Sequence, residues 1–339
     1  MLNLPAGDLS HEDRAHALRV FNKLLTTQEQ KLDAIGKGAA VPLTGLITLE
    51  GQDPEVLRLC CEALESIAQV HQGRLAIVEN HGGQALTQAM QIAPEAAAGA
   101  LRRFSQSNDG VQLLAPGLDF IVPALVSLIE EHKQDGVSCR ACENAAAMLS
   151  GAATTDDGIL CCLKHNVPLC IVHLIDRGLT GDFRFEKDLM SCLEQCSACL
   201  EQVAHHPDGK TAVREADGIR ALGQVLETAR WHRPTVVRAS AALMAVSIEK
   251  DSKVPIVLHA GKPLVRLLKG DDAELASNAR AALVSSCEHL EARRNLGPLL
   301  SEQEQKSILY RGPMPPTPPD FRYNVVLPYG PTDDLLTGR

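Results

Sequence analysis

One helical pattern, written about six times along the chain, limits this sequence to a narrow set of folds. The clearest copy runs from Thr235 to Leu268: a small-residue helix, a polar break, a short helix, Ala260-Gly261 and a Pro-Leu-rich helix. The glycine before the last helix of this pattern recurs along the chain as Gly38, Gly82, Gly218 and Gly261. These glycines are separated by 44, 136 and 43 residues. Three spacings of about 45 residues fill the middle gap, a period typical of two- or three-helix repeats. Such repeats bury their apolar faces by stacking on neighbours, so the sequence predicts an all-α solenoid.

Composition agrees with closely packed helices. Hydrophobic residues make up 45% of the 339 residues, yet aromatics make up only 3%. The core is therefore expected to consist of Leu, Ala, Val, Ile and Cys. Ala and Leu are strong helix formers, which favours an all-α protein.

Charge and termini exclude several classes of partner. The formal net charge is -9, whereas nucleic acids and anionic membranes require clustered Lys and Arg. Met1–Pro5 lacks the basic start and apolar run of a secretory signal, and no uncharged apolar stretch reaches the roughly 18 residues of a membrane span. Eleven cysteines without an export signal suggest reduced thiols. We therefore expect a cytoplasmic protein that binds neither nucleic acid nor membrane.

The chain divides into three predicted parts. Residues 1–27 form a capping helix with Ser10 as its N-cap, residues 28–309 form the repeats, and residues 310–339 form an extended tail. A proline is predicted to open one helix in each of several repeats, since its fixed φ and missing N–H suit a first turn: Pro42, Pro123, Pro168 and Pro263.

The tail differs from the repeats in composition. Seven of the 19 prolines lie between Pro313 and Pro331, which favours polyproline II over helix. Aromatic and aliphatic residues then alternate as in a lone strand. One interpretation is a disordered terminus; the one we favour is a docking segment that binds a partner or the repeats themselves, through Phe321, Tyr323, Val325, Leu327 and Tyr329.

Two segments, Ser240–Val246 and Ala260–Leu268, resemble the armadillo repeat, and the resemblance covers roughly residues 30–290. Peptide-binding armadillo proteins such as importin-α hold a peptide with a ladder of asparagines, preceded in importin-α by tryptophans one turn earlier. Alignment places other residues at the asparagine positions: Ser66, Arg103, Gly151, Gln202, Ala245 and Ser285. None of the positions one turn earlier holds tryptophan; they are Glu62, Gly99, Ala147, Ala198, Ala241 and Ala281.

This departure predicts a smooth, shallow groove that admits a helix or a protein surface in place of an extended peptide. Glu62, Arg103 and Gln202 are the candidate groove contacts. Trp231, the only tryptophan, lies in a loop before a helix. It either anchors a partner or covers the end of the stack.

No arrangement of residues indicates catalysis, a cofactor or a metal. Cys192, Cys196 and Cys199 share one helical face, and Cys139 and Cys142 form a CxxC pair, but one straight helix cannot surround a zinc ion. Together with the Cys60-Cys61 and Cys161-Cys162 pairs, they are interpreted as small buried hydrophobes between helices. His205-His206 reads as a solvated turn, and Gly36-Lys37-Gly38 lacks the context of a phosphate loop. The chain is therefore expected not to be an enzyme and to take no small-molecule substrate.

A second resemblance is to the small armadillo proteins of the ciliary radial spoke, carried by Ala239–Leu283. It implies a structural scaffold of the ciliary or flagellar axoneme whose partners are other proteins of a multi-subunit assembly. The alternative is a soluble cytosolic adaptor that binds cargo or assembly clients transiently. A third class, an enzyme that uses cysteine, requires a thiol with a depressed pKa.

Overall fold

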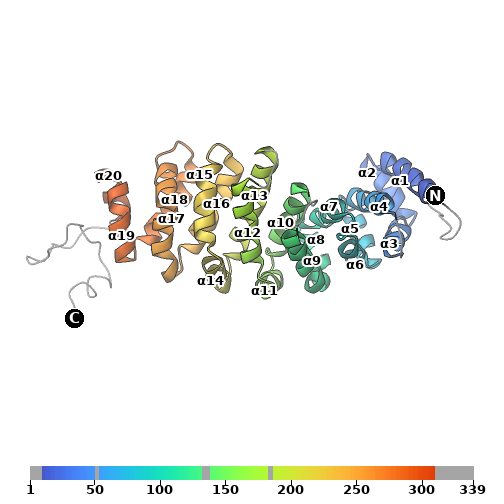
Figure 1. Cartoon of the computed structure of the whole chain (residues 1–339), viewed down its shortest axis with the longest axis horizontal. Coiled ribbons are helices and arrows are strands. Elements are labelled where there is room, and N and C mark those ends of the chain that lie inside the picture. Colours follow the sequence, from blue (N-terminus) through green and yellow to red (C-terminus); the bar gives the residue numbers. More distant parts are fainter. Residues whose placement is uncertain (1–9, 50–52, 132–137, 182–185, 310–339) are drawn as a thin grey trace, which may run out of the picture. The chain divides into compact units, whose positions relative to one another are not determined.

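The computed structural model describes residues 10–49, 53–131, 138–181 and 186–309, and within these ranges it is helical with no β-strand (Figure 1). The predicted all-α class is confirmed. The tail interpretation, with Phe321, Tyr323, Val325, Leu327 and Tyr329, lies outside the described residues.

The helices belong to two compact units. Unit 1 holds residues up to Leu174 together with Phe183–Cys199, and unit 2 holds Ile175–Asp182 and the chain from Leu200 onward. Two helices, α12 (Val167–Thr180) and α13 (Glu186–Val203), contribute residues to both units.

In unit 1, like helices of successive repeats stack on each other. The third helices of the repeats form one stack: α1 (His11–Leu24), α4 (Pro54–Ile67), α7 (Pro94–Ser105) and α10 (Cys139–Ala152). The second helices form another: α3 (Ala40–Thr48), α6 (Gly82–Ala89) and α9 (Leu118–Glu131). The short first helices form a third: α2 (Gln28–Gly36), α5 (His71–Glu79) and α8 (Asn108–Leu114), which continues into the 3-10 turn η1 (Ala115–Gly117). Helix α11 (Asp156–Lys164) packs on α9 and α10.

Unit 2 repeats the same plan with shorter connections. Its helices are α14 (Pro207–Glu215), α15 (Gly218–Thr228), α16 (Arg233–Val246), η2 (Lys250–Ser252), α17 (Lys253–Leu268), α18 (Ala273–Ser286), α19 (Leu290–Leu296), η3 (Gly297–Leu299) and α20 (Glu302–Ile308). Here α16 packs on α18, α15 on α17, and α17 on α19.

A left-handed residue makes the turn from the first to the second helix of a repeat. Positive φ values occur at Gly38 (73°), His81 (57°), Asn166 (53°) and Asp217 (63°). No such residue precedes Gly261, so α17 runs through Ala260-Gly261 as one helix. The break predicted there is wrong, because a glycine with helical φ does not by itself end a helix.

Two of the four prolines expected at helix starts lie elsewhere. Pro168 is the second residue of α12 and Pro42 the third of α3, as a first-turn preference requires. Pro123 and Pro263 instead lie inside α9 and α17. A proline inside a helix removes one backbone hydrogen bond, and in both cases the helix continues around it.

The core has the predicted composition. Its fully buried side chains include Leu64, Leu101, Leu125, Ile67 and Ile121. All cysteines are buried except the half-buried Cys139, as expected of small hydrophobes in the helix seams.

One described stretch, Asp109–Glu131, has the length and composition of a membrane span, with a mean hydropathy of 1.7. In unit 1 it is divided into α8, η1 and α9, and α9 packs against α6 and α10. Ile121, Val122 and Leu125 are fully buried in this packing, and 39% of the stretch's most apolar window is buried. Part of the hydropathy of the stretch thus comes from side chains of the repeat core.

Candidate protein-interaction groove

The stacked third helices α4, α7 and α10 enclose a surface hollow of about 620 Å³ in unit 1. Each repeat contributes the same face of its third helix, so the hollow runs across repeats. It is lined mostly by polar and charged side chains: Arg58, Glu62, Glu65, Ile92, Ala93, Pro94, Glu95, Ala96, Arg102, Arg103, Gln106, Ser138, Arg140 and Asn144.

Small residues bring these helices close together. A Cβ on Gly151 of α10 would lie 2.2 Å from the Cβ of Ser105 in α7, so only glycine permits this approach. A Cβ on Gly99 would lie 3.1 Å from Oε2 of Glu65 and 3.3 Å from Nδ2 of Asn144. The small side chains thus serve helix packing, and long charged side chains line the groove. The predicted smooth groove is wrong for unit 1.

Two arginines of α7 are tied to the neighbouring third helices. Arg103 donates from Nη2 to Oε1 of Glu65 in α4 at 2.7 Å. Arg102 donates from Nη1 to Oε1 of Glu143 and Oδ1 of Asn144 in α10, at 2.8 and 2.9 Å. These bonds join successive repeats and neutralise the two acidic groups.

Asn144 is a groove residue that the sequence analysis missed. It is 5% exposed, and its Nδ2 donates to the backbone carbonyl of Glu95 at 3.2 Å. It lies seven residues before Gly151, whereas the armadillo alignment looked for asparagine at that glycine and for tryptophan one turn before it. The available signal was an asparagine in an alanine-rich helix, where a buried amide needs a specific partner.

The most exposed charged group of the groove is Arg140, and an isoleucine is exposed in the same hollow. The side chain of Arg140 is 74% exposed, and its nearest carboxylate oxygen, Oε1 of Glu95, is 3.7 Å away. The side chain of Arg58 is 47% exposed and pairs with Glu62 within its own helix. Ile92, before α7, is 52% exposed. Glu95 is as exposed as Arg58, so the groove offers Arg140 as its most exposed charge together with an apolar side chain.

The predicted contact residues divide between the two units. Glu62 and Arg103 both line the groove of unit 1. Gln202 and Trp231 belong to unit 2. Trp231 lies between α15 and α16, is 57% exposed and has one edge-to-face neighbour, His232, at 5.7 Å between ring centres. Its role as a partner anchor stays a prediction.

The thiols of the core lack the character of nucleophiles. Burial raises the pKa of Cys60 and of Cys162 to about 12 and also raises the pKa of Cys196 and Cys199. A thiol nucleophile needs the opposite shift. His206 caps α14, since its Nδ1 accepts from the backbone N–H of Asp208 at 3.2 Å, and His205 is exposed in the same turn.

No protein-family model and no curated protein matches the sequence. Several solved structures are similar. Two engineered proteins match with TM-scores of 0.61 and 0.60 at 18% and 20% identity; each alignment covers 74% of this chain and 99% or 97% of the other. One of the computationally designed armadillo repeat proteins for modular peptide recognition matches with a TM-score of 0.59 at 19% identity, over 72% of this chain and 98% of the other. At such identities the likeness speaks for fold alone: the chain has an armadillo-like helical repeat fold.

Proposed function

We propose that this chain is a non-enzymatic scaffold that holds partner proteins in the groove formed by α4, α7 and α10. The observation that carries the proposal is the pairing pattern within the groove. Glu65 is engaged by Arg103, and Arg102 by Glu143, while Arg140 remains mostly exposed in the same hollow as Ile92. The most exposed charged side chain, Arg140, and the exposed Ile92 thus offer a partner positive charge and apolar surface.

This pattern selects a class of partner. A segment with Asp or Glu side chains can form charge-assisted bonds with Arg58 and Arg140, and an apolar side chain can cover Ile92. Because the chain carries a net charge of -9, such a segment is attracted only by the local field of the groove. Specificity then depends on these two arginines more than on overall charge.

Site-specific photocrosslinking tests the proposal. A photoreactive amino acid replaces Gln106, a neutral residue of the groove, in cells that express the protein, and Lys262 of α17 serves as the control position. We expect adducts at position 106 to map to partner segments rich in acidic and apolar residues. The double substitution R58E/R140E should abolish them, whereas K23E/K262E, with the same change of charge at exposed sites, should not.

Adducts that form equally from positions 106 and 262, or that survive R58E/R140E unchanged, contradict the proposal. Circular dichroism of R58E/R140E, recorded before crosslinking, should match the wild type. Both side chains are exposed, so their replacement leaves the core intact.

We further propose that the partners belong to a ciliary or flagellar axoneme. Support comes from the resemblance of Ala239–Leu283 to radial-spoke armadillo proteins. A component of such an assembly should stay with axonemes washed in high salt. Recovery in the cytosolic fraction of ciliated cells with exchange of partners would favour the transient adaptor instead.

A further inference from the structure

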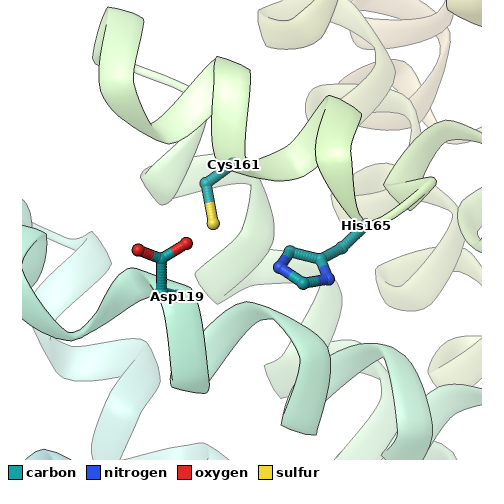
Figure 2. A group of neighbouring side chains, drawn as sticks. All are labelled: Asp119, Cys161 and His165. Carbon is teal, nitrogen blue, oxygen red and sulfur yellow. The ribbon is translucent and has the colours of Figure 1, made fainter.

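Three side chains with metal-binding atoms meet on the surface of unit 1, away from the groove. Asp119 lies in the first turn of α9, Cys161 lies in α11, and His165 is the residue that caps α11. One ligand atom from each lies within 4.8 Å of the others, and Figure 2 shows the three groups facing a common point. Among the described residues no second group of three His, Cys, Asp or Glu donors is gathered this closely.

We propose that Asp119, Cys161 and His165 bind a zinc ion. A thiolate, an imidazole nitrogen and a carboxylate oxygen are the three donor types that zinc takes in proteins, with bonds of about 2.0–2.3 Å. In a tetrahedral site such bonds place the donors roughly 3.3–3.7 Å apart. Side-chain movements that shorten the separations of up to 4.8 Å by about 1–1.5 Å would close the arrangement, and water would complete the fourth position.

The spacing along α11 supports the site. Cys161 and His165 are four residues apart, so they lie on one face, one turn above the other. Asp119 approaches this face from α9, which packs against α11. Two elements therefore contribute ligands, and the ion would join successive repeats of unit 1. This differs from the cysteines of α13, which lie along a single helix.

The state of His165 is an independent observation. Its Nε2 is buried and has no hydrogen-bond partner, and a ring nitrogen is turned toward Cys161 and Asp119 in Figure 2. An unsatisfied buried nitrogen costs free energy. A zinc ion bound to it would remove this cost, and a neutral imidazole is a common zinc ligand.

Lys164 pairs with one of the three groups of the proposed site. Its Nζ lies 2.8 Å from Oδ1 of Asp119, and the two side chains are 63% and 75% exposed. An exposed ion pair of this kind contributes little to stability, so the ammonium can leave when a divalent cation arrives. The exposure of Asp119 also gives the ion a path from solvent. Lys164 is thus a competitor of the metal, not a ligand.

Titration of the reduced, full-length chain with zinc, in competition with a chromophoric chelator, tests the site. We expect one zinc ion per chain. C161S, H165Q and D119N should each weaken binding by at least about 100-fold, because loss of an outer-shell partner alone costs about 10- to 100-fold. C139S, which alters the most exposed of the other thiols, should bind as the wild type does.

K164M distinguishes this site from adventitious binding to thiols. Removal of the competing ammonium should tighten zinc binding several-fold, whereas binding at other cysteines would be unaffected. Cobalt substitution gives a second readout, a sulfur-to-cobalt charge-transfer band that C161S should abolish. If C161S or H165Q fails to fold, D119N still tests the site, because Asp119 is exposed.

Two results would overturn the proposal: no stoichiometric zinc on the wild type, or zinc retained with unchanged affinity by C161S, H165Q and D119N.

Discussion

Glycines at the turn between a third helix and the next first helix are required for close packing. A Cβ on Gly158 would lie 1.8 Å from the carbonyl oxygen of Ala152, and one on Gly209 would lie 1.9 Å from that of Val203. Both contacts are with backbone, which cannot rotate away. The repeat therefore depends on glycine at this position for space, independent of φ.

G158A should destabilise unit 1 by about 1–3 kcal/mol, the typical cost of overpacking. Gly45 of α3 provides a matched control, because a Cβ there meets nothing within 4 Å. G45A should stabilise the same unit by roughly 0.5–1 kcal/mol through helix propensity. Urea unfolding followed by circular dichroism measures both changes. Equal effects of the two substitutions would contradict the packing argument.

The carboxylate of Asp109 makes the contact between the first helices α5 and α8 sensitive to acid. Hydrogen bonds from Arg74 and His71 hold the pKa of its carboxyl far below its usual range. Arg74 is 8% exposed and donates its Nη2 to Asp109 at 2.8 Å.

A depressed pKa adds stability above the unfolded-state pKa of about 3.9, and this stability is lost as pH falls toward the folded-state value. D109N should therefore cost about 1 kcal/mol at neutral pH, a value discounted for the partial exposure of the carboxylate. The difference from wild type should shrink below about pH 4. Unfolding curves at pH 7 and pH 3 measure it, and a constant difference would refute the assignment.

At the scale of elements, the stability that a leucine contributes depends on whether it lies on the buried side of its helix. Leu243 of α16 is fully buried, whereas Leu267, near the end of α17, is only partly buried. L243A should cost about 2–5 kcal/mol. L267A should cost clearly less, although both positions read alike in the sequence. Thermal or urea unfolding of the two variants decides, and equal losses would show that the burial pattern of unit 2 is misassigned.

Repeated features were predictable from the sequence, and features that join distant repeats were not. Period and composition were enough for the all-α repeat fold, because every repeat restates them. The continuity of α17 was missed, since it depends on the absence of a left-handed residue before Gly261. Asn144 and the group of Asp119, Cys161 and His165 were missed for a related reason. Their partners lie 42 to 49 residues away, and a single sequence does not reveal such contacts.

At the scale of the whole molecule, stability is shared between neighbouring repeats. Within each unit the helices of successive repeats pack on each other, so unfolding of a unit should depend on nearest-neighbour interfaces. Ion pairs across successive repeats follow this plan in both units, for example Arg103 with Glu65 and Arg266 with Glu227.

Removal of residues 321–339 should leave the helical signal and melting temperature unchanged and should weaken partner binding, if this segment docks on a partner. Circular dichroism and a binding assay on the truncated chain test both parts. A markedly lower melting temperature would mean that the segment packs on the repeats themselves.

The most direct test of the groove is the affinity of the wild type for two matched peptides, measured by fluorescence anisotropy. One peptide alternates acidic and apolar residues, and the other carries Asn and Gln in place of Asp and Glu. We expect the acidic peptide to bind at least about tenfold more tightly, with the preference falling as salt rises and disappearing in R58E/R140E. Equal affinity for both peptides, or a preference that R58E/R140E leaves unchanged, would contradict the account.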